Sequence, residues 1–433
     1  MLLRSLAYIV CKVFFKTISI SGIPHTGKGT LWIANHTSGI VDPCVLIGLA
    51  PVRLRPLAKH TLWNIPAMRL FLKLSEAIPV KRVKDISVFE EQFREDRHRD
   101  MFTETTKALL SGSNILIFPE GLSHDEPHIF RLKYGVARMA LQALNASKNS
   151  KVSIVIQPVA IDYSEKDEFR SDLCIHYCEP VTVSSQDFQI KDIMLGVRES
   201  LEKNLATFFS WDEKRNWRFL FELAYERPPV SSREFRVFVE KYREGFDNSP
   251  DILARIQTIR RLMQVRNLSP SQMSWAKKHH TKKEHFIIIL KHIWFYLFIS
   301  IPFRFLGALV WGVPYKLCES LSNMSPYGRD VKATMKITHG FYIFPAWSLI
   351  IAFLLSSYLN DIFPEFNLLI LWLLSFAAGP IFLLLSVVLS TTLYFFPGYW
   401  ELAKLRLFFP RAWTELMLEW KEITELVVNK IDG

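Results

Sequence analysis

A histidine with a nearby carboxylate comes early in the chain, at His36 and Asp42. Histidine can take a proton from a hydroxyl group near neutral pH, as an alcohol attacks an activated acyl carbon. A carboxylate on the other ring nitrogen fixes the tautomer and stabilises the imidazolium that forms. Direct attack needs no enzyme nucleophile. Ser38 lies close by in sequence, so a covalent serine route stays open, although the chain has no Gly-x-Ser-x-Gly motif to support it.

Two further motifs place charged side chains directly after short apolar runs. Lys81 and Arg82 follow Ile78–Val80, and an arginine can bind a phosphate through two parallel hydrogen bonds. Glu120 and Gly121 follow an apolar run that ends in a proline, which stops strand pairing before a turn that glycine permits. Glu120 could accept hydrogen bonds from acceptor hydroxyls. Each charge taken alone is more typical of a solvated surface residue.

Two weaker signals complete this set. Lys133 could add positive charge near the same place, and Gln157-Pro158-Val159 closes another apolar run. Ligands of open α/β sheets bind outside the carboxyl ends of the strands, so we expect the motifs to share one pocket. The combination of a base, a phosphate-binding cation and a hydroxyl-binding carboxylate indicates acyl transfer onto a phosphate ester that carries a free hydroxyl.

The elements that must position these residues alternate between short strands and helices. A long polar helix is expected from Ser87 to Leu110 and an amphipathic helix over Tyr134–Ala146. Strands are expected at Thr30–Ala34, Ile78–Val80, Asn114–Phe118, Val152–Val159 and Leu173–Tyr177. Strands separated by helices predict an α/β fold with a mixed sheet flanked by helices.

Length and composition limit the class of protein. The 433 residues suffice for two or three domains, and the formal net charge of +11 suits an anionic substrate, an anionic membrane or nucleic acid. Long apolar runs favour the membrane over nucleic acid, and no zinc-finger or RNA-recognition spacing is present. The five scattered cysteines are typical of reduced thiols in a cytosolic setting.

We divide the chain into four regions. Residues 1–27 are expected to hold an amphipathic helix that associates with a membrane, with an ordinary core-packing helix as the alternative. Residues 28–186 are predicted to form the catalytic α/β domain, and residues 187–284 a charged helical extension. Residues 285–433 are predicted to be membrane-associated and transmembrane helices, because this part holds most of the long apolar runs.

A transmembrane helical hairpin is the expectation for the C-terminal region. Phe341–Leu359 and Leu368–Phe396 carry no charged residue and are long enough to cross a bilayer. Lysines and arginines lie outside this pair and none lies between, so both ends and the catalytic domain are predicted on the cytosolic side. Two buried core helices are the alternative. The segment Phe286–Val313 is interrupted by charges and is predicted to be interfacial or re-entrant.

In this order, the motifs around His36, Arg82, Glu120 and Gln157 resemble the four conserved blocks of the glycerolipid acyltransferases. That family includes glycerol-3-phosphate and 1-acylglycerol-3-phosphate acyltransferases. The longer stretch from Phe118 to Pro127 resembles the branch that acts on glycerol-3-phosphate or dihydroxyacetone phosphate and carries a hydrophobic C-terminal region.

The resemblance implies a set of roles and co-substrates. His36 would be the catalytic base and Asp42 its partner, Arg82 would bind the acceptor phosphate, and Glu120 with Gly121 would shape the acceptor site. It implies an acyltransferase-type fold, an acyl donor that is acyl-CoA or an acyl carrier protein, and no cofactor or metal. Membrane lipids and a small phosphorylated acceptor would be the partners, in phospholipid biosynthesis.

Two departures from the family pattern stand out. The family usually places four residues between its histidine and aspartate, whereas five separate His36 from Asp42, and Gly39 could absorb the extra residue. The glycine that often opens the second block is Glu76 here. Three other functions stay open: acylation of a lysophospholipid, fatty-acid release by hydrolysis, and a non-catalytic membrane scaffold that binds lipid phosphates.

Overall fold

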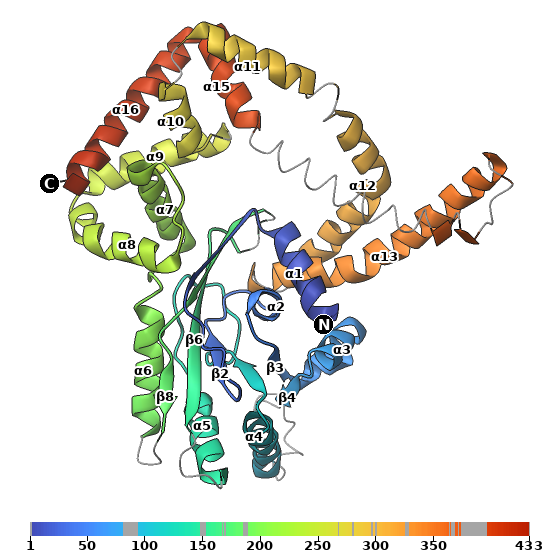
Figure 1. Ribbon diagram of the computed structural model, residues 1–433. Helices are drawn as coiled ribbons and strands as arrows, with labels where there is room; N and C mark the ends of the chain where they lie inside the picture. The colour runs from blue at the N-terminus through green and yellow to red at the C-terminus, as the bar shows by residue number, and fades with distance from the viewer. Residues whose placement is uncertain are drawn as a thin grey trace. The chain divides into compact units, whose positions relative to one another are not determined.

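The computed structural model divides the chain into two compact units (Figure 1). Unit 1 comprises Met1–Trp211, Val230–Val237 and Tyr327–Thr334, and unit 2 comprises Asp212–Pro229, Phe238–Pro326 and Met335–Gly433. The structure describes residues 2–80, 94–147, 153–166, 168, 170–184, 189–266, 268–278, 281–295, 298, 301–324, 329–362, 364, 369–370, 372–373 and 396–432.

Unit 1 is built on a mixed sheet in which eight strands are described. The order is β1-β7-β6-β2-β5-β3-β4, and β8 also pairs with β6. The strands are β1 (Thr17–Gly22), β2 (Leu31–Ala34), β3 (Leu54–Lys59), β4 (Ile78–Val80), β5 (Asn114–Ile117), β6 (Ile154–Tyr163), β7 (Asp172–Tyr177) and β8 (Val181–Val183). The prediction of a mixed α/β sheet is confirmed.

The strand directions define two edges of this sheet. β2, β3, β4, β5 and β6 run parallel through their pairings, whereas β7 is antiparallel to β6 and β1 is parallel to β7. We call the edge where β2, β5 and β6 end the carboxyl edge. The amino edge is the opposite one, where those strands begin and where β1 and β7 end.

Continuous apolar sequence explains why the central strands are buried on both faces. β2 reads Leu-Trp-Ile-Ala and β5 reads Asn-Ile-Leu-Ile, and every residue in both is buried. Such runs are typical of parallel strands covered by helices. All five predicted strands are present, although β6 continues to Tyr163 rather than ending at Val159. Three strands, β1, β3 and β8, were not predicted from the sequence.

Helices from three parts of the chain cover the core of the sheet. α4 (Arg94–Leu110) and α5 (Gly135–Ala146) confirm the described parts of two predicted helices, while residues 87–93 of the first lie outside the described residues. α6 (Ile190–Glu202) contributes Ile193, Val197 and Leu201 to the same apolar core. The predicted boundary at residue 187 therefore falls inside unit 1, because α6 completes the burial of β6 and β8.

The N-terminal helix is also integrated into unit 1. α1 (Leu2–Phe14) packs Ala7 against Cys44 and Ile47 of α2 (Val41–Leu49), with Phe71 of α3 (Pro66–Leu74) at the border of the cluster. β1 then pairs with β7. Residues 1–27 thus form part of the α/β unit, and α1 is amphipathic with its other apolar side exposed at residues that include Leu6 and Ile9.

Unit 2 is helical throughout its described part. Its elements include α9 (Pro250–Val265), α10 (Pro270–Lys278), α11 (Lys282–Phe295), α12 (Ile301–Asn323), α15 (Phe396–Phe408) and α16 (Pro410–Asp432). An ion pair of 2.8 Å between Arg255 and Glu422 joins α9 to α16. The ring of Trp217 in α7 (Trp211–Tyr225) meets those of Phe238 and Phe246 edge-on, which supplies an aromatic core.

One described helical segment is long and apolar enough to cross a bilayer. It is Thr338–Ile362 within α13 (Arg329–Ile362), and it contains the first predicted span. Most of the second predicted span, residues 374–395, lies outside the described residues, so the hairpin stays a prediction. The segment predicted as interfacial or re-entrant falls on α11 and α12, and Pro314 lies inside α12.

Candidate active site

The predicted base and its carboxylate meet at the carboxyl edge of the sheet. His36 lies in the loop after β2, and Asp42 is in the first turn of α2, where the helix dipole favours a negative charge. The distance from His36 Nδ1 to Asp42 Oδ2 is 2.9 Å. The longer spacing between the two residues is closed by a turn in which Gly39 takes a φ of 25° and Asp42 N donates to Ser38 O at 3.1 Å.

Asp42 is held by two further donors. The backbone N–H of Ser38 donates to Oδ2 at 2.8 Å, and the hydroxyl of Tyr163 donates to Oδ1 at 2.6 Å. Burial, followed by the charge of Asp42, raises the pKa of Tyr163 well above its usual value, so this hydroxyl stays a donor. An ionised carboxylate only accepts hydrogen bonds. Nδ1 of His36 therefore carries its proton, and Nε2 keeps a free lone pair.

The ring of His36 is fixed in orientation and remains partly accessible. It stacks on Phe118, with 4.1 Å between ring centroids, and 14% of its side chain is exposed. The preceding Asn35 ties the end of β2 to β6, because its amide donates to Ile161 O at 2.9 Å and accepts from Ile161 N at 2.8 Å. Ser38 is fully buried, so its hydroxyl is not presented to a substrate.

Glu120 lies beside His36, as predicted, but its carboxylate is occupied by protein donors. Oε1 accepts the backbone N–H of His36 at 2.8 Å, and Oε2 accepts the N–H of Phe130 at 3.1 Å. Oε2 also pairs with Nε2 of His124, and the Glu120 side chain is buried. In this arrangement the carboxylate supports the loop of the base rather than facing an acceptor hydroxyl.

His124 was not assigned a role from the sequence. Its Nδ1 accepts the N–H of Glu126 at 3.2 Å, so Nε2 is the nitrogen that donates to Glu120. Its ring stacks on Phe130 at 3.8 Å with an interplanar angle of 4°. The spacing of four residues between a glutamate and a histidine after a strand was the available signal, but only the folded loop shows that they pair.

Gly121 and Lys133 also lie together. Gly121 takes a φ of 73°, and a Cβ atom there would collide with the end of the Lys133 side chain. The Lys133 backbone N–H donates to Pro119 O at 2.8 Å, which closes the loop, and its side chain is exposed. Lys81 and Arg82 lie outside the described residues. The side chains of His36, Asp42, Glu120 and Lys133, together with Gly121, therefore lie at one edge of the sheet. The position of Arg82 stays a prediction from the sequence.

The expectation that the fourth motif joins this pocket is wrong for Gln157. β6 continues for four residues beyond Val159, and the Gln157 side chain serves the other edge. Its Oε1 accepts the N–H of His25 at 2.7 Å, and its Nε2 donates to Cys178 O at 2.7 Å. The sequence did not reveal this position, because the apolar run around Gln157 does not show which edge of the sheet its side chain faces.

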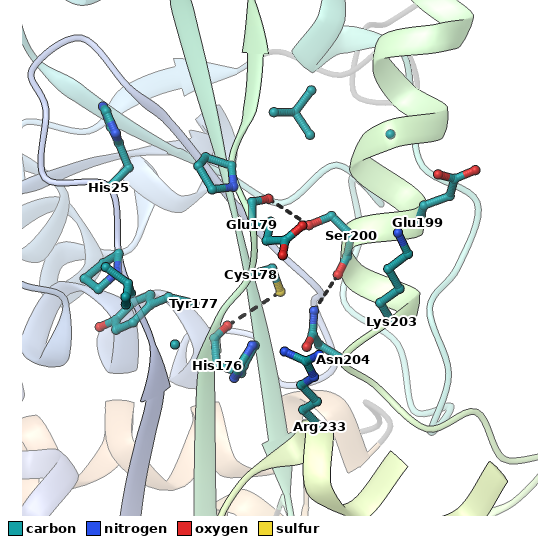
Figure 2. Close-up of a pocket in the computed structure, with 16 residues that line it drawn as sticks. His25, His176, Tyr177, Cys178, Glu179, Glu199, Ser200, Lys203, Asn204 and Arg233 are labelled. Atoms are coloured by element: carbon teal, nitrogen blue, oxygen red, sulfur yellow. Dashed lines mark hydrogen bonds between the residues drawn. The ribbon is translucent and has the colours of Figure 1, made fainter. Parts of the chain in front are cut away.

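A cavity of about 830 Å³ opens at the amino edge, next to these residues (Figure 2). It is lined by the end of β7, by the loop at Ile23–His25, by Ser200 of α6, and by Lys203 and Asn204 in the turn after α6 (Figure 2). Burial and then the charge of Arg233 lower the pKa of His176. Both cationic and acidic side chains line the cavity, and it contains none of the predicted catalytic residues.

The described residues contain no candidate metal site. No group of three or more His, Cys, Asp or Glu side chains there is arranged to hold a metal ion.

Comparisons with known proteins show similarity to acyltransferases. A family model described as Acyltransferase matches residues 18–162. Glycerol-3-phosphate O-acyltransferase 2 of Saccharomyces cerevisiae is 43% identical over 70 residues, which are 16% of this chain and 9% of that protein. Lyso-ornithine lipid O-acyltransferase of Brucella abortus is 26% identical over 159 residues, 36% of this chain and 53% of that protein.

A solved structure is also similar. The 1-acyl-sn-glycerophosphate acyltransferase of Thermotoga maritima matches with a TM-score of 0.34 and 16% identity, over 46% of this chain and 77% of that one. The chain spans about a tenth of the yeast enzyme's length and about half of the Brucella enzyme's.

Proposed function

We propose that this chain, of which residues 18–162 match a family model described as Acyltransferase, transfers a fatty acyl group from a thioester to a hydroxyl of glycerol-3-phosphate or dihydroxyacetone phosphate. The donor is acyl-CoA or an acyl carrier protein. The observation that carries the proposal is the His36–Asp42 pair of 2.9 Å with Nε2 of the ring left free.

The proposed reaction is a direct displacement. Nε2 of His36 takes the proton of the acceptor hydroxyl as its oxygen attacks the thioester carbonyl, and Asp42 stabilises the imidazolium. The new C–O bond forms, the C–S bond breaks, and the thiolate leaves with the proton from Nε2. A base in this position contributes roughly 10²- to 10⁴-fold in rate. Burial of the Ser38 hydroxyl favours this route over a seryl intermediate.

The acceptor site is proposed on the same edge. Arg82 would bind the acceptor phosphate in bidentate fashion, and the exposed Lys133 next to Gly121 would add a second charge. The contacts of Glu120 support a role in shaping this site through the loop of His36. No cofactor or metal is needed for this mechanism.

Acylation of a lysophospholipid is the second candidate. It is favoured by the similarity over 159 residues to an enzyme named for a lyso-lipid acceptor. Both candidates place the product in a membrane, which agrees with the apolar segment Thr338–Ile362 and the formal charge of +11. We propose an integral membrane protein with its α/β unit on the cytosolic face.

The test is acyl transfer by the purified full chain in detergent, with labelled acyl-CoA or acyl carrier protein and three competing acceptors: glycerol-3-phosphate, dihydroxyacetone phosphate and lysophosphatidic acid. We expect turnover of one of the first two, a loss of roughly 10²- to 10⁴-fold in His36→Ala, and unchanged turnover in the control His25→Ala at the amino edge. Full activity of His36→Ala would refute the assigned base. Preference for lysophosphatidic acid would select the second candidate, and transfer to water alone would indicate a hydrolase.

A further inference from the structure

The two loops that carry the proposed chemistry contact each other directly. The first loop, residues 35–40, carries His36, and the second, residues 119–130, carries Glu120. The backbone N–H of His36 reaches Glu120 at 2.8 Å, and His124 N donates to His36 O at 3.3 Å. Neither loop has a strand partner at these positions, so their separation depends on the side chains that join them.

A buried lysine from a third segment contacts both loops. Lys166 follows the end of β6, and its side chain is 1% exposed. Its Nζ donates to Thr37 O in the first loop at 2.9 Å and to His124 O in the second loop at 3.0 Å. Oδ1 of Asp125 lies 2.7 Å from Nζ and forms an ion pair outside hydrogen-bond geometry.

Aromatic packing closes the surroundings of this ammonium. The ring of Trp211 lies 5.5 Å from Nζ, within the range of a cation–π interaction, and its indole N–H donates to Asp125 O at 2.6 Å. The Lys166 ammonium therefore donates two hydrogen bonds to carbonyls, one from each loop. The rest of the ammonium faces Asp125 and the Trp211 ring.

A buried ammonium is costly unless it is paired and hydrogen-bonded. An apolar side chain would fill the same space without that cost, but it could not link two loop carbonyls. Lys166 binds the carbonyl of Thr37, one residue from His36, and the carbonyl of His124, four residues from Glu120. Displacement of a reacting group by about 1 Å can cost about 10²-fold in rate.

We propose that Lys166 is a positioning residue that sets the distance between the catalytic base on the first loop and the acceptor site on the second. The proposal rests on the proposed function. Asp125 supplies the counter-charge that keeps the ammonium in place. Lys166 touches no substrate in this role and acts through the carbonyls of Thr37 and His124.

The test measures kcat and the acceptor KM in Lys166→Met, with Lys107→Met as the control. Lys107 is exposed on α4 and pairs only with Glu104 at 3.1 Å in the described structure. We expect Lys166→Met to lose about 10²-fold in kcat, with the KM for the preferred acceptor changed far less, and the control to match the wild type. Lys166→Arg keeps the charge and should recover part of kcat. A normal kcat in Lys166→Met would overturn the proposal, as would a rise in KM alone.

Hydrogen exchange of the full chain gives a readout that does not depend on activity. Peptides covering residues 35–40 and 119–130 should exchange faster in Lys166→Met, whereas peptides from α5 should be unchanged. If the wild type acylates no acceptor, the proposed function fails, and the exchange data still decide whether Lys166 joins the loops. If Lys166→Met does not fold, Asp125→Asn replaces it, with the same pattern expected at a smaller size. The proposal would be contradicted if peptides from both loops exchanged at the same rate in the variant and in the wild type.

Discussion

At the carboxyl edge of the sheet, the side chains of Asp42, Glu120 and Lys166 are each buried and bound by several protein groups. At the amino edge, Lys203 and Arg233 line an open cavity, and neither forms an ion pair with a carboxylate in the described part of the chain. At the first edge, protein donors occupy the carboxylates of Asp42 and Glu120, while the second edge has a large cavity lined by exposed charges.

This difference shows what marks the site of chemistry in unit 1. A base must be held in one tautomer and one orientation, which requires buried partners whose hydrogen bonds are all satisfied. A cavity lined by exposed charges offers volume but no such constraint. The cavity in Figure 2 is therefore a weaker guide to the reaction than the hydrogen bonds around His36.

Asp42→Asn is expected to have the largest effect. A small effect would contradict the idea that the buried partners at the carboxyl edge mark the site of chemistry. An amide at this position can donate to Nδ1 of His36, which would move the ring proton to Nε2 and remove the free lone pair. We expect kcat to fall about 10³- to 10⁴-fold with a smaller change in the melting temperature. Steady-state kinetics and thermal unfolding check this. Activity within a few-fold of the wild type would show that Asp42 does not set the tautomer.

Glu120→Gln tests whether this carboxylate supports the loop or binds the acceptor. Its oxygens accept three protein donors, and an amide would turn an N–H group toward at least one of them. We expect a loss of about 1–3 kcal/mol in the free energy of unfolding, measured by denaturant titration. The acceptor KM should change little. A large rise in KM at unchanged stability would instead place Glu120 against the acceptor.

Arg233→Gln probes the amino edge through pH. The folded pKa of His176 lies below its ordinary value of 6.5, so the unfolded chain binds more protons there and stability falls as pH drops below about 6.5. Removing Arg233 removes a repulsion and raises the pKa of His176. The variant should therefore lose less melting temperature than the wild type between about pH 7 and pH 5. Acyl transfer should be unchanged, and reduced transfer would show that the two edges are coupled.

Glu76→Gly is expected to have the smallest effect. Glu76 takes a φ of 53° before β4, at the amino edge, where a side chain costs about 1 kcal/mol. Its carboxylate pairs with Arg53 at 2.7 Å, and this exposed pair contributes about 0–1 kcal/mol. The gain and the loss nearly cancel, so the change in unfolding free energy should stay below about 1 kcal/mol. Glu76→Ala keeps the strained backbone and should be the less stable of the two variants.

Much of the sheet could be predicted because its central strands are continuous apolar runs that end in recognisable residues. The missed strands carry weaker signals: β1 reads Thr-Ile-Ser-Ile-Ser-Gly, and β3 contains a proline and two basic residues. They become strands because β7 and β5 provide partners, which no local pattern reveals. The same reason explains why α6 was assigned to a separate extension, although its apolar face packs on the core.

The site was predicted to a similar extent. His36, Asp42, Glu120, Gly121 and Lys133 were chosen for their chemistry and their place after strands, and the structure brings them to one edge. Their partners were not chosen: Tyr163 lies 121 residues from Asp42, and Lys166 lies 129 residues from Thr37. A tyrosine and a lysine near the end of a strand are ordinary residues until the strand order makes them neighbours of the base.

The sequence by itself determined which chemical groups are available, a base, its carboxylate and a loop that follows a strand, because side-chain type and short-range spacing are local properties. Only the tertiary structure decided which of those groups stay free. It leaves Nε2 of His36 open and occupies Glu120 with protein donors, since hydrogen bonds in a buried site depend on segments that are far apart in the chain and adjacent in the fold.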